Sequence, residues 1–303
     1  MELVLVGTDA GCRTFCRTGE LRVELSGRNV GALSPRDNGE CLAIVDDKEI
    51  WRRDISGGWT HLATADISLQ SITASGDLIF GGAMDEPAVL RISPKGDVVR
   101  LVGFNNTEGR AEWIANGPPL GVRAMTTTTD AKTTLAAVHV GGIPRSIDRG
   151  ETWSPTIPIE FDVHDIEFHP ISPNVVAAAA AVGLCLSLDG GISWTVFGND
   201  FENLTSLAVA VLPDEVLFSV QDGPFASRSQ VWRYVLGDGQ IKQVTEGLPE
   251  WLEGKVDTNW IATGHGRAAI VDGGGNLWLS GEGSRDWVRI ATCLPYVFGL
   301  ALL

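Results

Sequence analysis

The chain has 303 residues, of which 44% are apolar and 20% charged, so it can bury a sizeable core and is not globally disordered. Its formal net charge of −15 argues against a nucleic-acid partner and an anionic membrane surface, because both would repel it. Glycine accounts for 36 residues without a Gly-X-Y period, which excludes collagen and indicates many turns between short strands.

The N-terminal segment, MELVLVGTDAG, lacks the basic start and the long apolar stretch of a signal peptide. The longest apolar run, residues 175–186, is shorter than the roughly 18 residues of a membrane span. The cysteines are odd in number and scattered, as expected for reduced thiols: Cys12, Cys16, Cys41, Cys185 and Cys293. We therefore expect a cytoplasmic protein without a membrane span.

Along the first 118 residues, the sequence predicts short strands joined by turns. Residues 3–28 contain three strand-like segments, LVLVGTDAG, CRTFC and LRVEL. Residues 29–66 and 67–118 each hold one unit of four such segments. In the first of these units, Asp54 precedes Trp59 at a spacing that recurs later in the chain.

Two segments farther along share one pattern: SIDRGETW, residues 146–153, and SLDGGISW, residues 187–194. They lie about 41 residues apart, a period typical of propellers and solenoids. Both fit S-x-D-x-G-x-[ST]-W, in which the Asp carboxylate can accept backbone N–H groups of a tight turn, Gly supplies a positive φ and Trp packs beside the turn. Weaker copies of the pattern end at Trp59 and Trp287.

These two segments resemble the Asp-box (BNR) repeat of sialidase-like β-propellers. The resemblance implies that each box is the turn between the third and fourth strands of a blade, and that the whole chain is a propeller. The sialidase catalytic pattern is absent, since no R-I-P motif lies near the start and residues 142–145 (GIPR) lead directly into a box. Of the two tyrosines, Tyr234 falls in a third strand, away from the channel. We therefore expect the fold of that superfamily without its activity.

The remaining blades follow at the same period, over residues 119–160, 161–203, 204–254 and 255–294. Within them, residues 175–183 (VVAAAAAVG) are compatible with a helix by propensity, but they occupy the second-strand position of their blade. Residues 295–303 (PYVFGLALL) provide one more inner strand, which completes the blade begun by residues 3–28. We therefore predict an all-β fold, a seven-bladed β-propeller of four-stranded antiparallel blades, closed by the N- and C-terminal strands in one blade.

Three connections are longer than the period requires, at residues 102–118, 221–230 and 245–255. All three are predicted on the face opposite the Asp-box turns, and repeat proteins tend to carry their binding loops on one such face. Each contains an aromatic residue suited to a pocket wall or an interface anchor: Trp113, Phe225 and Trp251. Neutral variation of surface loops is the alternative explanation.

The first strand of each blade lines the channel, so its inward residues near the loop-rich face are candidate ligand contacts. Alignment of these strands places residues of mixed polarity at one level: Gly31, Gln70, Arg123, His164, Thr205, Trp260 and Phe298. In the last blade, Asn259 is an alternative to Trp260. Polar residues at one level favour recognition of a polar ligand, although a water-filled channel would also explain them.

The ends of the second strands add another level of polar residues, among them Asp46, His139, Gln221 and Asp272. Acidic residues in the adjoining loops favour a cation, an amine or a basic peptide at this mouth, but solvated carboxylates on turns explain them more simply. The chain has no phosphate-binding motif and no diagnostic spacing of metal ligands, so we expect neither a cofactor nor a metal.

Two functions remain open. The first is a non-catalytic module that binds a small molecule or a protein segment at the channel mouth. The second is a small-molecule hydrolase or lyase with His164 as general base, Arg123 as oxyanion stabiliser and His139 in the same site. Asp165 is expected to face the sheet packing rather than His164, because successive strand residues point to opposite faces. A deep pocket where His139, His164 and Arg123 converge would favour the enzyme, and a broad exposed apolar patch would favour the binding module.

Overall fold

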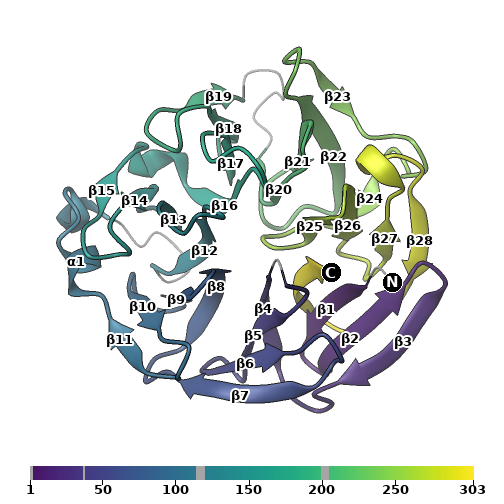
Figure 1. Cartoon of the computed structure of the whole chain (residues 1–303). Coiled ribbons are helices and arrows are strands. Elements are labelled where there is room, and N and C mark those ends of the chain that lie inside the picture. The colour runs from purple at the N-terminus through teal and green to yellow at the C-terminus, as the bar shows by residue number, and fades with distance from the viewer. Residues whose placement is uncertain (1–2, 37, 114–119, 199–204) are drawn as a thin grey trace.

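The computed structural model describes residues 3–36, 38–113, 120–198 and 205–303. In this part of the chain the strands form seven antiparallel sheets, which surround a central axis as the blades of a ring (Figure 1). The predicted seven-bladed propeller is therefore confirmed. No helix in the described residues has both the length and the apolar composition needed to cross a membrane.

The blades follow one another around the ring, each with its strands in the order given from the axis outward. Blade 1 contains β29 (Val297–Leu302), β1 (Val4–Thr8), β2 (Gly11–Cys16) and β3 (Gly19–Glu24). Blade 2 contains β4 (Val30–Pro35), β5 (Cys41–Val45), β6 (Glu49–Arg53) and β7 (Trp59–Thr64). Blade 3 contains β8 (Leu69–Ser75), β9 (Leu78–Ala83), β10 (Val89–Ile92) and β11 (Val98–Arg100). Blade 4 contains β12 (Val122–Thr127), β13 (Thr134–Val138), β14 (Pro144–Ser146) and β15 (Ser154–Pro155).

The last three blades have the same organisation. Blade 5 contains β16 (Val163–Phe168), β17 (Val176–Ala180), β18 (Gly183–Ser187) and β19 (Thr195–Phe197). Blade 6 contains β20 (Val209–Val211), β21 (Glu215–Gln221), β22 (Arg228–Val235) and β23 (Ile241–Gln243), with β24 (Leu252–Glu253) paired to β22. Blade 7 contains β25 (Ile261–Gly264), β26 (Arg267–Val271), β27 (Leu277–Leu279) and β28 (Val288–Ala291). The short helical elements are α1 (Val102–Asn105), η1 (Arg110–Glu112), η2 (Ile159–Phe161) and η4 (Glu282–Ser284).

The ring is closed by strands from the two chain ends, as the sequence predicted. β29 pairs with β1 in antiparallel register, and Figure 1 shows the N- and C-terminal ends close together in one blade. Leu3 N donates to Leu303 O at 2.9 Å, and Leu303 N donates to Leu3 O at 2.8 Å. This pairing gives blade 1 its fourth strand and leaves no gap between the first and last blades.

The second strands of the blades are buried on both faces, because each blade is covered by a blade on either side. In β17, all five residues of Val176–Ala180 are fully buried. Ala177 and Ala179 belong to the apolar cluster shared with blade 6, whereas Ala178 and Ala180 belong to the cluster shared with blade 4. Small side chains on alternating faces suit the narrow space between blades, so this alanine run forms a strand and not a helix.

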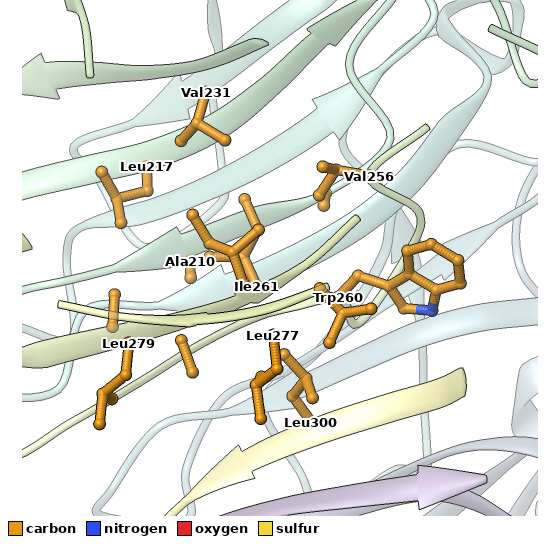
Figure 2. Close-up of a cluster of buried hydrophobic side chains, with 14 of the residues drawn as sticks. Ala210, Leu217, Val231, Val256, Trp260, Ile261, Leu277, Leu279 and Leu300 are labelled. Atoms are coloured by element: carbon orange, nitrogen blue, oxygen red, sulfur yellow. The ribbon is translucent and has the colours of Figure 1, made fainter. Parts of the chain in front are cut away.

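The largest apolar cluster lies between blades 6, 7 and 1 and includes residues from both chain ends. Figure 2 shows part of it, with Leu217, Ile261 and Leu300 pointing toward one another from three different strands. Trp260 lies at the border of the cluster, with 6% of its surface exposed. The packing that closes the ring therefore also fixes the position of Trp260.

The segments at residues 146–153 and 187–194 form turns that share several hydrogen bonds, between β14 and β15 and between β18 and β19. In the first turn, Asp148 Oδ1 accepts from Thr152 N at 2.9 Å, and Ser146 Oγ accepts from Gly150 N at 2.9 Å. The turn at residues 187–194 repeats both bonds at the corresponding positions, each at 2.9 Å. These bonds satisfy the turn within itself, so the turns are structural elements of the fold.

We name the two ends of the channel by their connections. The box face carries the turns that follow the first and third strands of each blade, including the two Asp-box turns. The loop face carries the other connections, and the three long ones lie there as predicted: they join β11 to β12, β21 to β22 and β23 to β25. Of the first connection, residues 114–118 lie outside the described residues.

Candidate functional site

Several of the residues predicted to lie at one level of the channel are found at β-bulges in the inner strands. Gln70, Arg123 and His164 are each the extra residue at a register shift, where β8, β12 and β16 pair with their second strands. Phe298 occupies the same position in β29. A bulge re-aims the side chain of the extra residue, so these side chains leave the regular alternation of the strand.

Two of the predicted histidines meet at a carboxylate that the sequence analysis did not single out. His139 Nε2 lies 3.4 Å from Asp162 Oδ1, and His164 Nε2 lies 3.4 Å from Asp162 Oδ2. Both imidazole rings are buried, with 6% of each side chain exposed, whereas 29% of the Asp162 side chain is exposed. The two buried rings therefore contact the Asp162 carboxylate on its inner side, and the rest of the carboxylate is open to solvent.

The backbone at Asp162 explains how this residue reaches both histidines. Asp162 has a φ of 49°, a left-handed conformation, between η2 and β16. Ala181 N donates to Asp162 O at 3.0 Å and holds the peptide against the end of β17. Asp is one of the few residues that tolerate this conformation, but an Asp directly before a strand is too common a pattern to have marked it in advance.

Burial raises the pKa of Asp162, but the nearby groups lower it by more, so that the pKa lies below its ordinary value. The largest of the lowering effects comes from His164, followed by His139 and Arg123. The carboxylate is therefore ionised at neutral pH.

His164 has both ring nitrogens directed at acceptors. Its Nδ1 lies 2.9 Å from Ser206 O, a carbonyl that can only accept, so Nδ1 carries a proton. Its Nε2 faces the Asp162 carboxylate. This arrangement positions His164 to support Asp162 and differs from the predicted role of His164 as a general base open to substrate.

Arg123 connects this group of residues to blade 7 across the channel. Its guanidinium donates to Thr258 Oγ1 at 3.2 Å and lies 3.8 Å from Asp257 Oδ1. Thr258 Oγ1 in turn donates to His164 O at 3.2 Å, and Lys255 pairs with the other oxygen of Asp257. We call Arg123, His139, Asp162 and His164 the Asp162 cluster; residues 255–258 tie it to the neighbouring blades at the loop face.

A second group of predicted residues lines one cavity of about 490 Å³ on the loop face, between blades 6, 7 and 1. Phe225, Trp260 and Asp272 come from three separate places in the sequence and meet there. Lys255 and Tyr296 complete the wall. We call this cavity the aromatic pocket. Its residues do not include any member of the Asp162 cluster.

The channel itself holds a larger cavity of about 610 Å³, whose lining includes the turns of the box face. Two carboxyl groups that we did not predict line it, Asp165 and Glu167. As expected, Asp165 does not face His164. The bulge at His164 places the Asp165 carboxyl, 5% exposed, at the channel and against backbone N–H groups of blades 6 and 7.

Both channel carboxyls join three blades. Asp165 Oδ2 accepts from Val209 N at 3.3 Å and from Asn259 N at 3.2 Å. Glu167 Oε2 accepts from Val211 N at 3.2 Å, and its Oε1 accepts from Thr263 Oγ1 at 3.3 Å. Burial raises the pKa of Asp165 to about 7; burial, with a smaller effect of the Asp165 charge, raises the pKa of Glu167 to about 8.

Several other predicted site residues lie apart from these groups. Trp113 is buried, with 7% exposed, and packs edge-on against Phe104 at a ring distance of 5.7 Å, so its ring belongs to the core and not to an exposed anchor. The Trp251 ring is covered by Arg228 at 3.9 Å. Asp46 pairs with Arg28 on blade 2.

Three predicted residues are engaged by the backbone or by neighbouring rings. Gln70 Nε2 donates to Ala83 O at 3.3 Å, and Thr205 pairs with Gln221 through backbone bonds. The Phe298 ring lies 5.0 Å from that of Tyr296. In the described part of the chain, no group of three or more His, Cys, Asp or Glu side chains is arranged to hold a metal ion.

Comparisons with known proteins agree on the fold. No protein-family model and no curated protein matches the chain. The periplasmic gluconolactonase of Pseudomonas aeruginosa has a similar structure, with a TM-score of 0.66 at 13% identity over 100% of this chain and 99% of that one. The GH74 xyloglucanase of Xanthomonas campestris reaches a TM-score of 0.62 at 19% identity, and the GH74 enzyme of Niastella koreensis 0.64 at 15%.

The match to the GH74 enzymes is partial. It covers 86% of this chain but 45% of each of those two enzymes, so the chain spans less than half of their length. At these identities the likeness shows a shared propeller fold, and activity does not follow from fold.

Proposed function

We propose that this propeller binds a small polar molecule at the loop face, over the Asp162 cluster. The observation that supports the proposal is the convergence of His139 and His164 on a single partly exposed carboxylate, whose pKa is also lowered by the charge of Arg123, the third residue predicted for this site. Asp162 and Arg123 have opposite charges, with 29% and 25% of their side chains exposed, and the two buried imidazole rings lie against Asp162. A rigid pair of exposed polar groups on a buried support is the arrangement expected of a preorganised binding site.

The charges suggest the chemistry of the ligand. An ionised Asp162 accepts hydrogen bonds from hydroxyl groups, and Arg123 binds carboxylates through its planar guanidinium. A hydroxy acid offers both groups in one small molecule. The gluconolactonase that shares the fold acts on the lactone of such an acid, which lends modest support to this class.

The test is isothermal titration with D-gluconate. We expect binding that Asp162→Asn and Arg123→Gln each weaken about tenfold, while Arg149→Gln, on an exposed turn of the box face, leaves it unchanged. Equal binding by all four proteins, or none by the native chain at about 10 mM, would contradict the proposal.

A second candidate is a hydrolase or lyase at the same cluster. It is favoured by the ionised carboxylate held between two imidazoles, and by the hydrolases among the proteins of similar structure. In this case we expect Asp162 to be the general base, Arg123 the stabiliser of an oxyanion, and the histidines to position Asp162. Hydrolysis of glucono-1,5-lactone that Asp162→Asn reduces at least about a hundredfold would support it; a rate equal to that of buffer alone would exclude it for this substrate.

We also infer kinship with the Asp-box propellers. The Ser and Asp hydrogen bonds that the turns at residues 146–153 and 187–194 share support this inference.

A further inference from the structure

The aromatic pocket has features of a ligand site that the Asp162 cluster does not explain. Its volume of about 490 Å³ lies within the range of small-molecule sites, about 300–1,000 Å³. It opens at the loop face beside the junction of the first and last blades. The closure of the ring therefore creates it, and no single blade contains it.

The pocket presents aromatic rings to solvent. Phe225, in the connection between β21 and β22, is 96% exposed, and among the described residues it has no aromatic partner. Tyr296 is 56% exposed. An isolated exposed ring beside a cavity gains by covering its apolar surface, and a flat ligand ring can provide that cover.

The third ring is fixed in place. Trp260 Nε1 donates to Val297 O at 3.1 Å, and its ring meets Tyr296 nearly edge-on at 6.5 Å. Trp260 belongs to the apolar cluster shown in Figure 2 and lies at its edge. One wall of the pocket is thus rigid before any ligand arrives, which lowers the entropic cost of binding.

Part of the pocket lining consists of glycines, Gly254 and Gly273–Gly275, which expose their backbone. A Cβ at Gly273 would lie 2.9 Å from Gly254 Cα, so the two glycines allow blades 6 and 7 to approach each other there. Asp272 shapes this part of the lining: its Oδ1 accepts from Gly274 N at 3.0 Å and from Asn276 Nδ2 at 3.0 Å. The Asp272 carboxylate is therefore occupied by its own turn, which makes it a positioning residue and not a ligand contact.

Lys255 is the remaining charged residue of the pocket lining. Its ammonium lies 5.9 Å from the Trp260 ring and pairs with Asp257 at 2.5 Å. The Asp272 carboxylate is 2% exposed and bonded to its own turn, so the Lys255 ammonium is the charged group that a ligand meets at this edge. An ammonium group at the edge of a pocket favours an anionic ligand over a neutral or cationic one.

We propose that the aromatic pocket binds a small molecule composed of a flat ring and a carboxylate, with the ring between Phe225 and Tyr296 and the carboxylate facing Lys255. The proposal goes beyond the proposed function, because the pocket shares no residue with the Asp162 cluster.

The test uses benzoate, its neutral analogue benzamide and its cationic analogue benzylamine as probes. Binding is followed through the indole N–H signals in nitrogen-15 NMR spectra, with the Trp260 signal assigned from the Trp260→Phe variant. We expect benzoate to shift the Trp260 signal and to bind about tenfold more tightly than either analogue. Phe225→Ala, a change at an exposed position, should weaken benzoate about tenfold, and Lys255→Gln should remove the preference for benzoate over benzamide.

Two controls separate this site from its neighbours. Ile55→Ala, at a 77% exposed position on the box face, and Arg123→Gln, in the Asp162 cluster, should both leave benzoate binding unchanged. Loss of benzoate binding in Arg123→Gln with retention in Phe225→Ala would place the anion at the cluster and overturn the pocket proposal while leaving the proposed function standing. No shift of the Trp260 signal at about 10 mM benzoate, or equal affinity for benzylamine, would also overturn it.

Discussion

At the scale of single residues, the buried Arg53 shows how a charge can be held by a partner in the adjacent blade. Arg53 is 1% exposed and forms a bidentate pair with Glu24, with distances of 2.8 and 2.9 Å. Glu24 also accepts from Trp59 Nε1 at 2.7 Å and from Arg22 Nε at 2.7 Å. One carboxylate in blade 1 therefore accepts hydrogen bonds from the buried Arg53 and the partly buried Trp59 of blade 2.

Replacement of Glu24 by Ala is expected to destabilise the protein by about 3–5 kcal/mol, because it leaves Arg53 buried without its counter-charge. Urea unfolding at neutral pH measures the change. Glu20→Ala, which removes the more exposed pair with Arg13, is the control and should change stability by no more than about 1 kcal/mol. Equal effects of the two substitutions would show that the buried pair is not needed for stability.

Glu167 illustrates the opposite case, a carboxyl whose ionisation opposes folding. Its pKa is raised to about 8, so between the ordinary value near 4.3 and pH 8 the folded state binds more protons than the unfolded state. The contribution of this group to stability is thus fully present below about pH 4.3 and is lost as pH rises through 8.

Glu167→Gln should remove most of that loss. A glutamine can accept from Val211 N and donate to Thr263 Oγ1, whose own hydrogen can then be directed to Val211 O, 3.0 Å away, in place of Glu167 Oε1. We expect the variant to be more stable than the native chain by about 1–3 kcal/mol at pH 8.5 and equal to it near pH 4.5. Urea unfolding at both pH values measures this, and a difference independent of pH would contradict it.

At the scale of elements, the turns depend on glycines in left-handed conformations that are also enclosed. Gly150 has a φ of 86°, and a Cβ there would lie 2.5 Å from Leu101 Cδ1 and 3.1 Å from Phe80 Cε1. Gly223 has a similar φ of 74°, but a Cβ there would meet nothing within 4 Å. The two positions separate the conformational requirement from the packing requirement.

We therefore expect Gly223→Ala to cost about 1–2 kcal/mol for its backbone conformation alone. Gly150→Ala should cost about 1–3 kcal/mol more, because the added methyl must displace core side chains. Thermal unfolding of the two variants provides the comparison. Equal melting temperatures would mean that the side chains around Gly150 rearrange to accommodate a methyl group without a loss of stability.

At the scale of the whole molecule, the ring is closed by hydrogen bonds between β29 and β1 and not by a covalent link. A circular permutant can join residue 303 to residue 1 through a short Gly-Ser linker and begin at Asp238, in the exposed turn after β22. It keeps every strand pair. We expect this permutant to fold with a melting temperature within a few degrees of the native one.

Deletion of residues 295–303 should instead abolish cooperative unfolding, because it removes the inner strand of blade 1 and exposes the edge of β1. Circular dichroism and calorimetry of the two proteins measure the contrast. A deletion that melts like the native chain would show that six blades and a partial seventh are sufficient.

The sequence by itself determined the fold, because the information for it is local and repeated. A turn such as Ser146–Trp153 satisfies its own hydrogen bonds and recurs at a fixed period, so the strands between successive turns and the number of blades follow from spacing. The same period placed Gln70, Arg123 and His164 at one level of the channel, and the structure locates all three at bulges.

Only the tertiary structure decided which side chains meet. His139 and His164 come together on Asp162 because of a left-handed φ before β16, and Asp165 turns to the channel because a single extra residue shifts the strand register. The aromatic pocket forms where the last blades meet the first. These contacts join segments that are distant in the sequence, and they depend on one-residue shifts of strand register. A repeat pattern in the sequence does not reveal such shifts.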